Sequence, residues 1–261
     1  MIKYIEVLIN VPINSSFTYA INDKNIDIGF RVEVPFGKNN SRNVTGFVIN
    51  VFDILPPNFN IPKENIKEVI KVLDSAPLFT KEQIDLAMWV AKYYICAPGE
   101  ALANMLPSAK KESSSGFFSL TEEDFSYKKH NLSEEQKKAI SDILNSKDNN
   151  LHYLYGSTGT GKTEVFLSVA EEILKQNKGI IYLVPEIGLT HQVIESVTKR
   201  FGDTVAILHS GLTPTKKLTQ WNRILNGEAK IVIGARSAIF APVPNLGLVI
   251  IDEEHDGSYK S

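Results

Sequence analysis

Short stretches of alternating apolar and polar residues fill the first part of the chain. Val, Ile, Tyr and Phe are concentrated there in segments of strand length, with Pro, Gly and Asn residues between them. Five strands are therefore predicted, at residues 3–9, 15–21, 30–34, 44–51 and 66–73. Short strands separated by turns in this way predict a small all-β barrel or sandwich.

The pattern changes to the period of a helix after Thr80. Thr80 and Gln83 match a capping box, and apolar residues then recur at helical spacing. The Pro-Gly pair at residues 98–99 is expected to end this helix, before a second short helix at residues 100–105. Residues 1–107 are therefore predicted to form one β-rich domain.

The remainder of the chain has a different organisation. Residues 108–131 are mostly polar and are predicted to be a linker. Residues 132–261 alternate helical patterns with apolar runs, which are typical of parallel strands covered on both faces. These runs are residues 151–155, 179–184, 204–208, 230–234 and 246–251. We therefore predict a multidomain chain, with a small all-β barrel-like domain followed by an α/β domain built on a parallel sheet.

Composition and charge exclude several classes of protein. The 261 residues are 43% hydrophobic and 22% charged, as in soluble globular proteins. The net charge of −2 does not indicate the strongly basic surface of many nucleic-acid binders, so any DNA contact must come from local groups. The single cysteine excludes a disulfide framework and a cysteine-based zinc site within this chain. No membrane-spanning run or secretory signal is evident, so we expect a cytoplasmic protein with no membrane contact.

A complete phosphate-loop motif, G-x-x-x-x-G-K-T, lies between a predicted strand and a predicted helix. Its glycines let backbone N–H groups surround phosphate oxygens, and the helix adds its positive N-terminal end. Lys162 is expected to reach the β- and γ-phosphates of ATP, and the Thr163 hydroxyl is expected to bind Mg²⁺. The alternative is a glycine-rich turn without a ligand. The expected ATP-binding residues of this loop are Gly156, Ser157, Thr158, Gly159, Thr160, Gly161, Lys162 and Thr163.

An acidic sequence, D-E-E-H, follows the last apolar run. Asp252 is expected to hold Mg²⁺ opposite Thr163, and Glu253 to orient or deprotonate the attacking water. His255 is expected to belong to the same ATP site. Surface acids after a strand are common, but after a phosphate loop this sequence favours a nucleotide hydrolase over a small-molecule kinase. The expected catalytic residues are Lys162, Thr163, Asp252 and Glu253.

Polar residues also follow two other predicted strands. His209 and Arg236 are expected at the carboxyl edge of the sheet, where open α/β sheets bind ligands. Ordinary loop polarity is the alternative explanation for either residue alone. Gln136 completes a capping box that begins at Ser133, and a glutamine at the start of a helix can still reach outward.

Several longer motifs together resemble the PriA helicases, superfamily 2 enzymes with a DEEH box. The resemblance implies an ATP-dependent 3′-to-5′ DNA helicase that assembles a primosome at stalled replication forks, with a RecA-like lobe in residues 132–261. It also implies that His209 and Arg236 contact DNA and that Gln136 contacts adenine. The motifs are residues 156–163, 183–190, 208–212 and 231–260 in the second domain and residues 11–12, 17–19, 29–38 and 72–74 in the first.

The same resemblance assigns the first domain to binding the 3′-hydroxyl end of DNA. An aromatic ring can stack on a terminal base, a glycine permits close backbone approach, and a lysine can pair with phosphate. Without the resemblance, Phe17 and Tyr19 would be interpreted as core residues of a strand. The pocket residues implied by matched position are Phe17, Thr18, Gly37 and Lys67, with Lys38 as a neighbour.

The resemblance further implies parts of the parent protein that this chain does not carry. Residues 108–131 are too short for the family's winged-helix domain. A second motor lobe with arginine fingers and a Cys-rich zinc-binding domain are expected beyond residue 261. The chain alone is therefore expected to bind ATP, Mg²⁺ and DNA 3′ ends but to hydrolyse ATP poorly. Primosome and single-strand-binding proteins are the expected partners. The alternative is a non-enzymatic DNA-end-binding module with a passive nucleotide-binding lobe.

Overall fold

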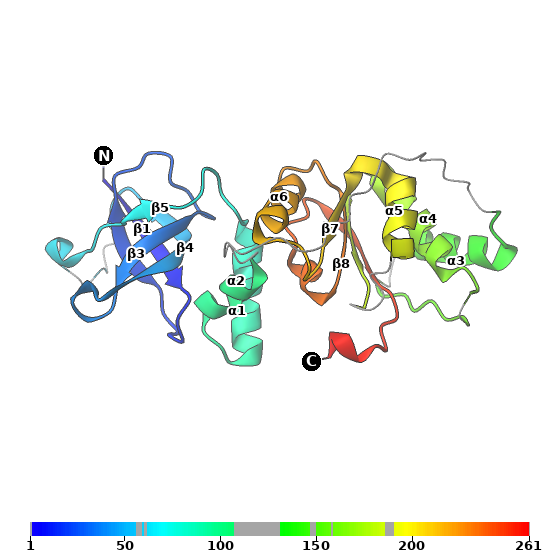
Figure 1. The fold of residues 1–261 in the computed structure, drawn as a ribbon, viewed down its shortest axis with the longest axis horizontal. Helices are drawn as coiled ribbons and strands as arrows, with labels where there is room; N and C mark the ends of the chain where they lie inside the picture. The colour runs from blue at the N-terminus through cyan, green and yellow to red at the C-terminus, as the bar shows by residue number, and fades with distance from the viewer. Residues whose placement is uncertain are drawn as a thin grey trace. The chain divides into compact units, whose positions relative to one another are not determined.

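The computed structural model describes residues 2–55, 59, 62–106, 131–146, 150–157, 159–185 and 191–260. The chain divides into two compact units, Met1–Lys110 and Lys111–Ser261, which Figure 1 shows in blue to green and in green to red. Nearly all of the predicted linker at residues 108–131 lies outside the described residues, so the predicted domain boundaries stay predictions. Within the described residues, no helix has the length and apolar character needed to cross a membrane.

The first unit is a curled sheet of five strands (Figure 1). Neighbouring strands run antiparallel in the order β2-β1-β4-β3-β5. The alternation predicted from the sequence is present, since Val32 and Val34 of β3 are fully buried while Arg31 and Glu33 are partly exposed. The strands are β1 (Lys3–Ile9), β2 (Phe17–Ile21), β3 (Arg31–Phe36), β4 (Arg42–Phe52) and β5 (Lys71–Val72).

One segment joins the two edges of this sheet. The sequence predicted a single strand at residues 66–73, but only its end forms a ladder with β3. The Val69 N–H donates to the Ala20 carbonyl of β2 at 2.9 Å, and the Ile70 N–H donates to the Glu33 carbonyl of β3 at 2.9 Å. Because consecutive residues bond to opposite edges, the sheet closes in the manner of a barrel, and the predicted barrel-like fold is confirmed.

Two helices, α1 (Lys81–Tyr94) and α2 (Pro98–Met105), complete the first unit. The predicted capping box of α1 is present, with Thr80 and Gln83 bonded in both directions. Pro98 begins α2 instead of only ending α1, because proline is favoured in the first helical turn. Gly99 lets α2 lie directly against β1, since a Cβ there would overlap the Ile9 carbonyl.

The second unit contains a parallel sheet of four strands in the order β7-β8-β6-β9. Each strand begins and ends within one residue of its predicted position. The strands are β6 (Gly179–Leu183), β7 (Val205–Leu208), β8 (Ile231–Gly234) and β9 (Leu246–Ile251). The helices are α3 (Glu134–Asn145), α4 (Lys162–Lys175), α5 (His191–Phe201) and α6 (Pro214–Leu225).

Helices cover both faces of this sheet, which explains why its strands are apolar throughout (Figure 1). Alternate residues of β6 pack into two hydrophobic cores, one on each face of the sheet. Tyr182 packs with Leu167 of α4 and Val197 of α5, while Ile181 packs on the other face with Ile224 of α6. The predicted doubly covered parallel sheet is therefore confirmed.

The predicted strand at residues 151–155 is wrong. Within the described residues this segment is a strand of neither sheet, and three of its four large apolar side chains are between 70% and 88% exposed. The Tyr153 hydroxyl instead lies 3.4 Å from the Glu254 carboxylate. The segment joins neither edge strand of the four-stranded sheet, β7 or β9, so apolar character alone does not make it a strand.

Candidate functional site

The phosphate loop leads directly into helix α4. Gly159 and Gly161 have φ angles of 85° and 78°, a conformation that glycine adopts without strain. The Lys162 ammonium donates to the carbonyls of Gly156 at 2.7 Å and Ser157 at 3.1 Å. The lysine side chain therefore folds over the loop that precedes it. Thr158, also predicted to bind ATP, lies outside the described residues.

Gln136 connects the start of α3 to the phosphate loop. Its side-chain oxygen accepts from the Ser133 N–H at 2.9 Å, which completes the predicted capping box. Its amide nitrogen donates to the Thr160 carbonyl at 3.0 Å. A Cβ on Gly161 would lie only 2.5 Å from that nitrogen, so glycine is required here for the contact. The two ends of one amide thus hold a helix start against the loop, while the adenine contact stays a prediction.

The two residues predicted to hold Mg²⁺ meet at the hydroxyl of Tyr182. Tyr182 lies on β6, is 1% exposed, and donates to the Asp252 carboxylate at 2.8 Å. The Thr163 side chain also lies close to this hydroxyl and acts against the rise of the Tyr182 pKa. Burial, followed by the charge of Asp252, raises the pKa of Tyr182 far above its ordinary value, so its hydroxyl is a permanent donor. Thr163 and Asp252 therefore converge although they are far apart in sequence.

This donor set fits a magnesium ion. A hydroxyl and a carboxylate are hard oxygen ligands, which Mg²⁺ prefers, and the ion usually takes its remaining ligands from water and phosphate. The glycines beside Thr163 provide the close backbone approach that a phosphate needs. In such a site Thr163 and Asp252 would hold the ion, which neutralises charge on the phosphates when bound.

The residues after Asp252 turn away from the sheet. Glu253 has a φ of 48°, which is uncommon for a residue with a side chain, and its N–H donates to the Asp252 carboxylate at 3.1 Å. The Tyr259 hydroxyl donates to the Asp252 carbonyl at 3.0 Å. The side chain of His255 is 78% exposed and lies 3.8 Å from Glu254. The structure therefore holds Asp252 firmly, whereas the roles of Glu253 and His255 stay predictions.

His209 and Arg236 lie at the same sheet edge as Asp252. In the parallel registers, Leu208 is level with Gly234 and Leu183 is level with Ile251. The residues that follow these strand ends therefore form one row, as predicted. Arg236 begins a short 3₁₀ helix and is exposed. Their predicted contacts with DNA stay predictions.

His209 has its own hydrogen bond. Its Nδ1 accepts from the Gly211 N–H at 3.1 Å, so this nitrogen carries no proton in the bond. Partial burial lowers the pKa of His209, and the positive charge of Lys217 adds to the effect. The imidazole is therefore held as a neutral acceptor at the end of β7.

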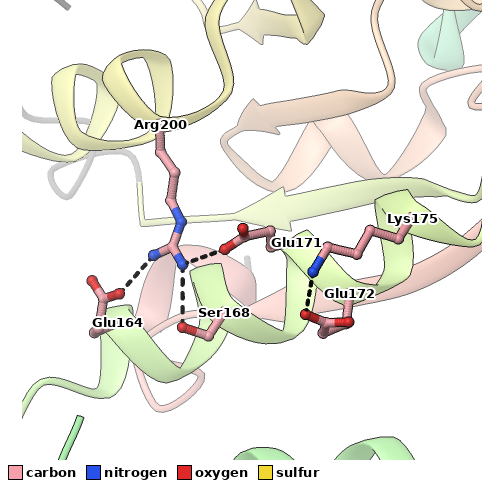
Figure 2. Close-up of polar contacts among 6 residues, drawn as sticks. All are labelled: Glu164, Ser168, Glu171, Glu172, Lys175 and Arg200. Carbon is pink, nitrogen blue, oxygen red and sulfur yellow. Dashed lines mark hydrogen bonds and ion pairs between the residues drawn. The ribbon is translucent and has the colours of Figure 1, made fainter. Parts of the chain in front are cut away.

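A buried arginine fixes the phosphate-loop helix to α5 (Figure 2). Arg200 is 4% exposed and contacts Glu164 at 2.7 Å, Glu171 at 2.8 Å and Ser168 at 3.3 Å, all on α4. Glu164 directly follows Thr163 in the chain. The orientation of the first turn of α4 is thus coupled to the packing of α5.

The first unit contains a pocket of about 640 Å³. Four of the five residues predicted for the DNA end line it, and Lys38 follows directly after one of them. Phe17 is only half-buried, whereas Tyr19 is 3% exposed and donates to the Pro35 carbonyl at 3.2 Å. The lining residues are Glu6, Ser16, Phe17, Thr18, Tyr19, Phe36, Gly37, Phe52, Phe59, Asn65, Ile66 and Lys67.

Aromatic rings form one wall of this pocket. The rings of Phe17 and Phe36 meet edge to face with centroids 5.3 Å apart. The Arg42 guanidinium lies 5.3 Å from the Phe36 centroid, which adds a positive charge beside the wall. Gly37 has a φ of 88°, and a Cβ there would lie 2.7 Å from the Ser41 hydroxyl. The pocket therefore presents flat apolar surfaces next to positive charge, as nucleotide stacking sites do.

Glu6 provides a carboxylate in the same pocket. It lies directly opposite Thr18 in the β1–β2 register and opposite Asn50 in the β1–β4 register. Its carboxylate accepts hydrogen bonds from the Ser16 hydroxyl and, at 2.7 Å, from the Asn50 amide. Glu6 is therefore held in place by neighbours on both sides.

Comparison with known families matches each unit separately. Residues 6–107 match the family described as 3′DNA-binding domain (3′BD) of PriA. Residues 133–261 match the DEAD/DEAH box helicase family. A phosphate loop and a DNA-end domain thus occur in one chain, in the order predicted.

Whole-chain comparison decides the family. The chain is 44% identical to replication restart protein PriA of Treponema pallidum over 264 aligned positions, which include 100% of this chain. This chain belongs to the PriA family. It is also 34% identical to the PriA protein of Borreliella burgdorferi and 30% identical to that of Haemophilus influenzae, with 99% of the chain covered in both.

The chain spans 40%, 39% and 45% of the length of these three PriA proteins, respectively. The activities and partners of a whole PriA protein are therefore proposals for this chain.

Three residues of the two candidate sites are not predicted from the sequence. Tyr182 was counted as an apolar strand residue, since no motif marks it. Glu6 and Arg42 lie on strands whose polar residues look like ordinary exposed positions. A tyrosine inside an otherwise aliphatic strand was the one available signal, because a buried hydroxyl needs a partner.

Proposed function

We propose that this chain is the ATP-binding and DNA-end-binding part of a 3′-to-5′ DNA helicase that acts in replication restart in the cytoplasm. The observation that carries the proposal is the buried hydrogen bond from Tyr182 to Asp252, which places Asp252 near Thr163 at the end of a complete phosphate loop. The pocket around Phe17 and Lys67, in a separate unit, supplies the second half of the proposal.

The chain's own residues account for nucleotide binding. Backbone N–H groups of the loop and the N-terminal end of α4 would bind phosphate oxygens. Lys162 would exchange its two carbonyl partners for the β- and γ-phosphates. Glu253 would orient the attacking water, and Gln136 would contact adenine in addition to its bonds within the protein. His255 would complete the site.

The first unit would hold the 3′ end of a DNA strand. A terminal base would stack on the Phe17–Phe36 wall, and Lys67 would pair with a backbone phosphate. Lys38, His209 and Arg236 would add contacts to the rest of the strand. Proteins of the primosome and single-strand-binding proteins are the proposed partners.

Hydrolysis by the 261-residue chain is proposed to be slow. An arginine that reaches the phosphates from another part of the protein typically accelerates such reactions by on the order of 10³–10⁵, and this chain spans less than half of its relatives. A zinc-binding domain is likewise proposed only for the parent protein.

Steady-state ATP turnover and equilibrium binding on one forked DNA substrate test the proposal. We expect ATP binding that requires Mg²⁺, DNA-end binding, and little turnover. Absence of ATP binding would contradict the nucleotide site. DNA-end binding that is the same with and without ATP would favour the non-enzymatic module.

A further inference from the structure

The pocket of the first unit contains one negative and one positive side chain. Among the described residues that line it, Glu6 is the only carboxylate and Lys67 the only ammonium group. The rest of the lining is aromatic, apolar or neutral and polar. A ligand of this pocket therefore meets a strong acceptor as well as a strong donor.

The Glu6 carboxylate is anchored but not saturated. The Ser16 hydroxyl and the Asn50 amide each donate one hydrogen bond, to different carboxylate oxygens. A carboxylate has about four lone-pair sites, so roughly two remain for a ligand donor. Because Ser16 and Asn50 hold it from both sides, the carboxylate would lose little freedom on binding.

We propose that Glu6 is the acceptor that recognises the 3′-hydroxyl group of a DNA end. The inference rests on the proposed end-binding function and adds the residue that determines its chemical specificity. A free 3′-hydroxyl donates a hydrogen bond, which a carboxylate accepts with the strength of a charged partner.

The same carboxylate disfavours a phosphorylated end. A 3′-phosphate has no need of an acceptor and places negative charge beside Glu6, while Lys67 attracts both kinds of end through their phosphates. Lys67 therefore provides affinity without discrimination, and Glu6 provides the discrimination. A 3′-deoxy end, which lacks the hydroxyl, would leave the carboxylate without its partner.

Fluorescence anisotropy with the full 261-residue chain tests this assignment. Three otherwise identical forked DNAs would end in a 3′-hydroxyl, a 3′-phosphate or a 3′-deoxy sugar. A hydrogen bond to a charged group corresponds to roughly tenfold or more in affinity. We expect the unaltered chain to prefer the hydroxyl end over both others by about this factor.

Substitutions then identify the residue responsible. Glu6→Ala removes the acceptor, so it should abolish most of the preference over both other ends while the 3′-deoxy end still binds. Glu6→Gln removes the charge but keeps a carbonyl acceptor, so it should lose chiefly the discrimination against the 3′-phosphate. Glu33→Gln, on β3 and outside the pocket lining, is the matched control and should keep the full preference. Ser16→Ala keeps the carboxylate and loses one anchor, so it should reduce the preference only in part.

The outcomes distinguish the role of Glu6 from the end-binding function itself. An unchanged preference in both Glu6 variants would overturn the assignment and leave the end-binding function standing. If the unaltered chain binds all three ends equally, the assignment is wrong. If it also binds them no better than a circular DNA without a 3′ end, the proposed end-binding function is wrong as well. Thermal unfolding of each variant shows that a lost preference is not lost folding.

Discussion

The Tyr182 hydroxyl donates a hydrogen bond of 2.8 Å to the carboxylate of Asp252. One partner is at the centre of the sheet and the other immediately follows an edge strand. Because Thr163 lies beside the same hydroxyl, the two proposed Mg²⁺ ligands are close to each other before any ion binds. Such preorganisation lowers the cost of assembling a site.

Tyr182→Phe tests this relationship. The ring and its packing remain, so the change removes a buried hydrogen bond to a charged group, which is worth about 1.5–3 kcal/mol. We expect a loss of unfolding free energy of that size in urea, and a weaker dependence of ATP affinity on Mg²⁺. Tyr259→Phe is the matched control, because it removes a bond only to the Asp252 carbonyl. Equal effects of the two variants would contradict the positioning role.

Glutamates of helix α4 form a buried ion pair with Arg200 of α5 and an exposed ion pair with Lys175, so the two kinds of pair can be compared directly (Figure 2). Arg200→Ala leaves Glu164 with its buried charge poorly compensated, which typically costs about 3–5 kcal/mol. Lys175→Ala breaks a pair whose lysine side chain is 61% exposed, so its unfolding free energy should hardly change. Chemical denaturation measures both. A loss below about 1 kcal/mol for Arg200→Ala would show that α4 does not depend on this network.

Lys162→Ala should weaken ATP binding without unfolding the chain. The ammonium contacts only loop carbonyls in the structure, and we expect it to reach phosphates when ATP binds. Loss of charged hydrogen bonds predicts roughly tenfold or more lower affinity by calorimetry. Lys175→Ala, at the other end of α4, should bind ATP normally. Unchanged affinity after Lys162→Ala would exclude the phosphate role.

The lowered pKa of His209 predicts that it destabilises the fold in acid. The unfolded chain takes up a proton on this imidazole as the pH falls through about 6.5, and the folded chain resists doing so. The unfolded state then binds more protons, so stability decreases as the pH falls below that value. NMR titration should give a midpoint below 6.5 for His209. His209→Gln should lessen the acid-induced drop in Tm, whereas replacing the exposed His152 should not.

The sequence predicted what depends on local pattern. Capping boxes at Thr80 and Ser133, and the strands of both sheets other than β5, follow from residue order and periodicity. The row of His209, Arg236 and Asp252 followed from the rule that the carboxyl ends of parallel strands lie at one edge. These features need no knowledge of which elements become neighbours.

The remaining features depend on contacts between distant residues. The run at residues 151–155 is apolar enough for a strand, but within the described part of the chain it is a strand of neither sheet. Tyr182 meets Asp252 across 70 positions, and Glu6 meets Asn50 across 44. Only the strand registers bring these pairs together, and the local sequence does not determine the registers.

The segment that closes the barrel also carries Lys67. Its backbone bonds to β2 at Val69 and to β3 at Ile70, so an open barrel would separate the lysine from the aromatic wall. Folding of the first unit and formation of its pocket are therefore a single equilibrium. A DNA end that binds only the closed form would add its binding free energy to the stability of the barrel. A substitution that weakens the bonds of this segment to β2 or β3 would therefore weaken DNA binding without changing any residue that contacts DNA.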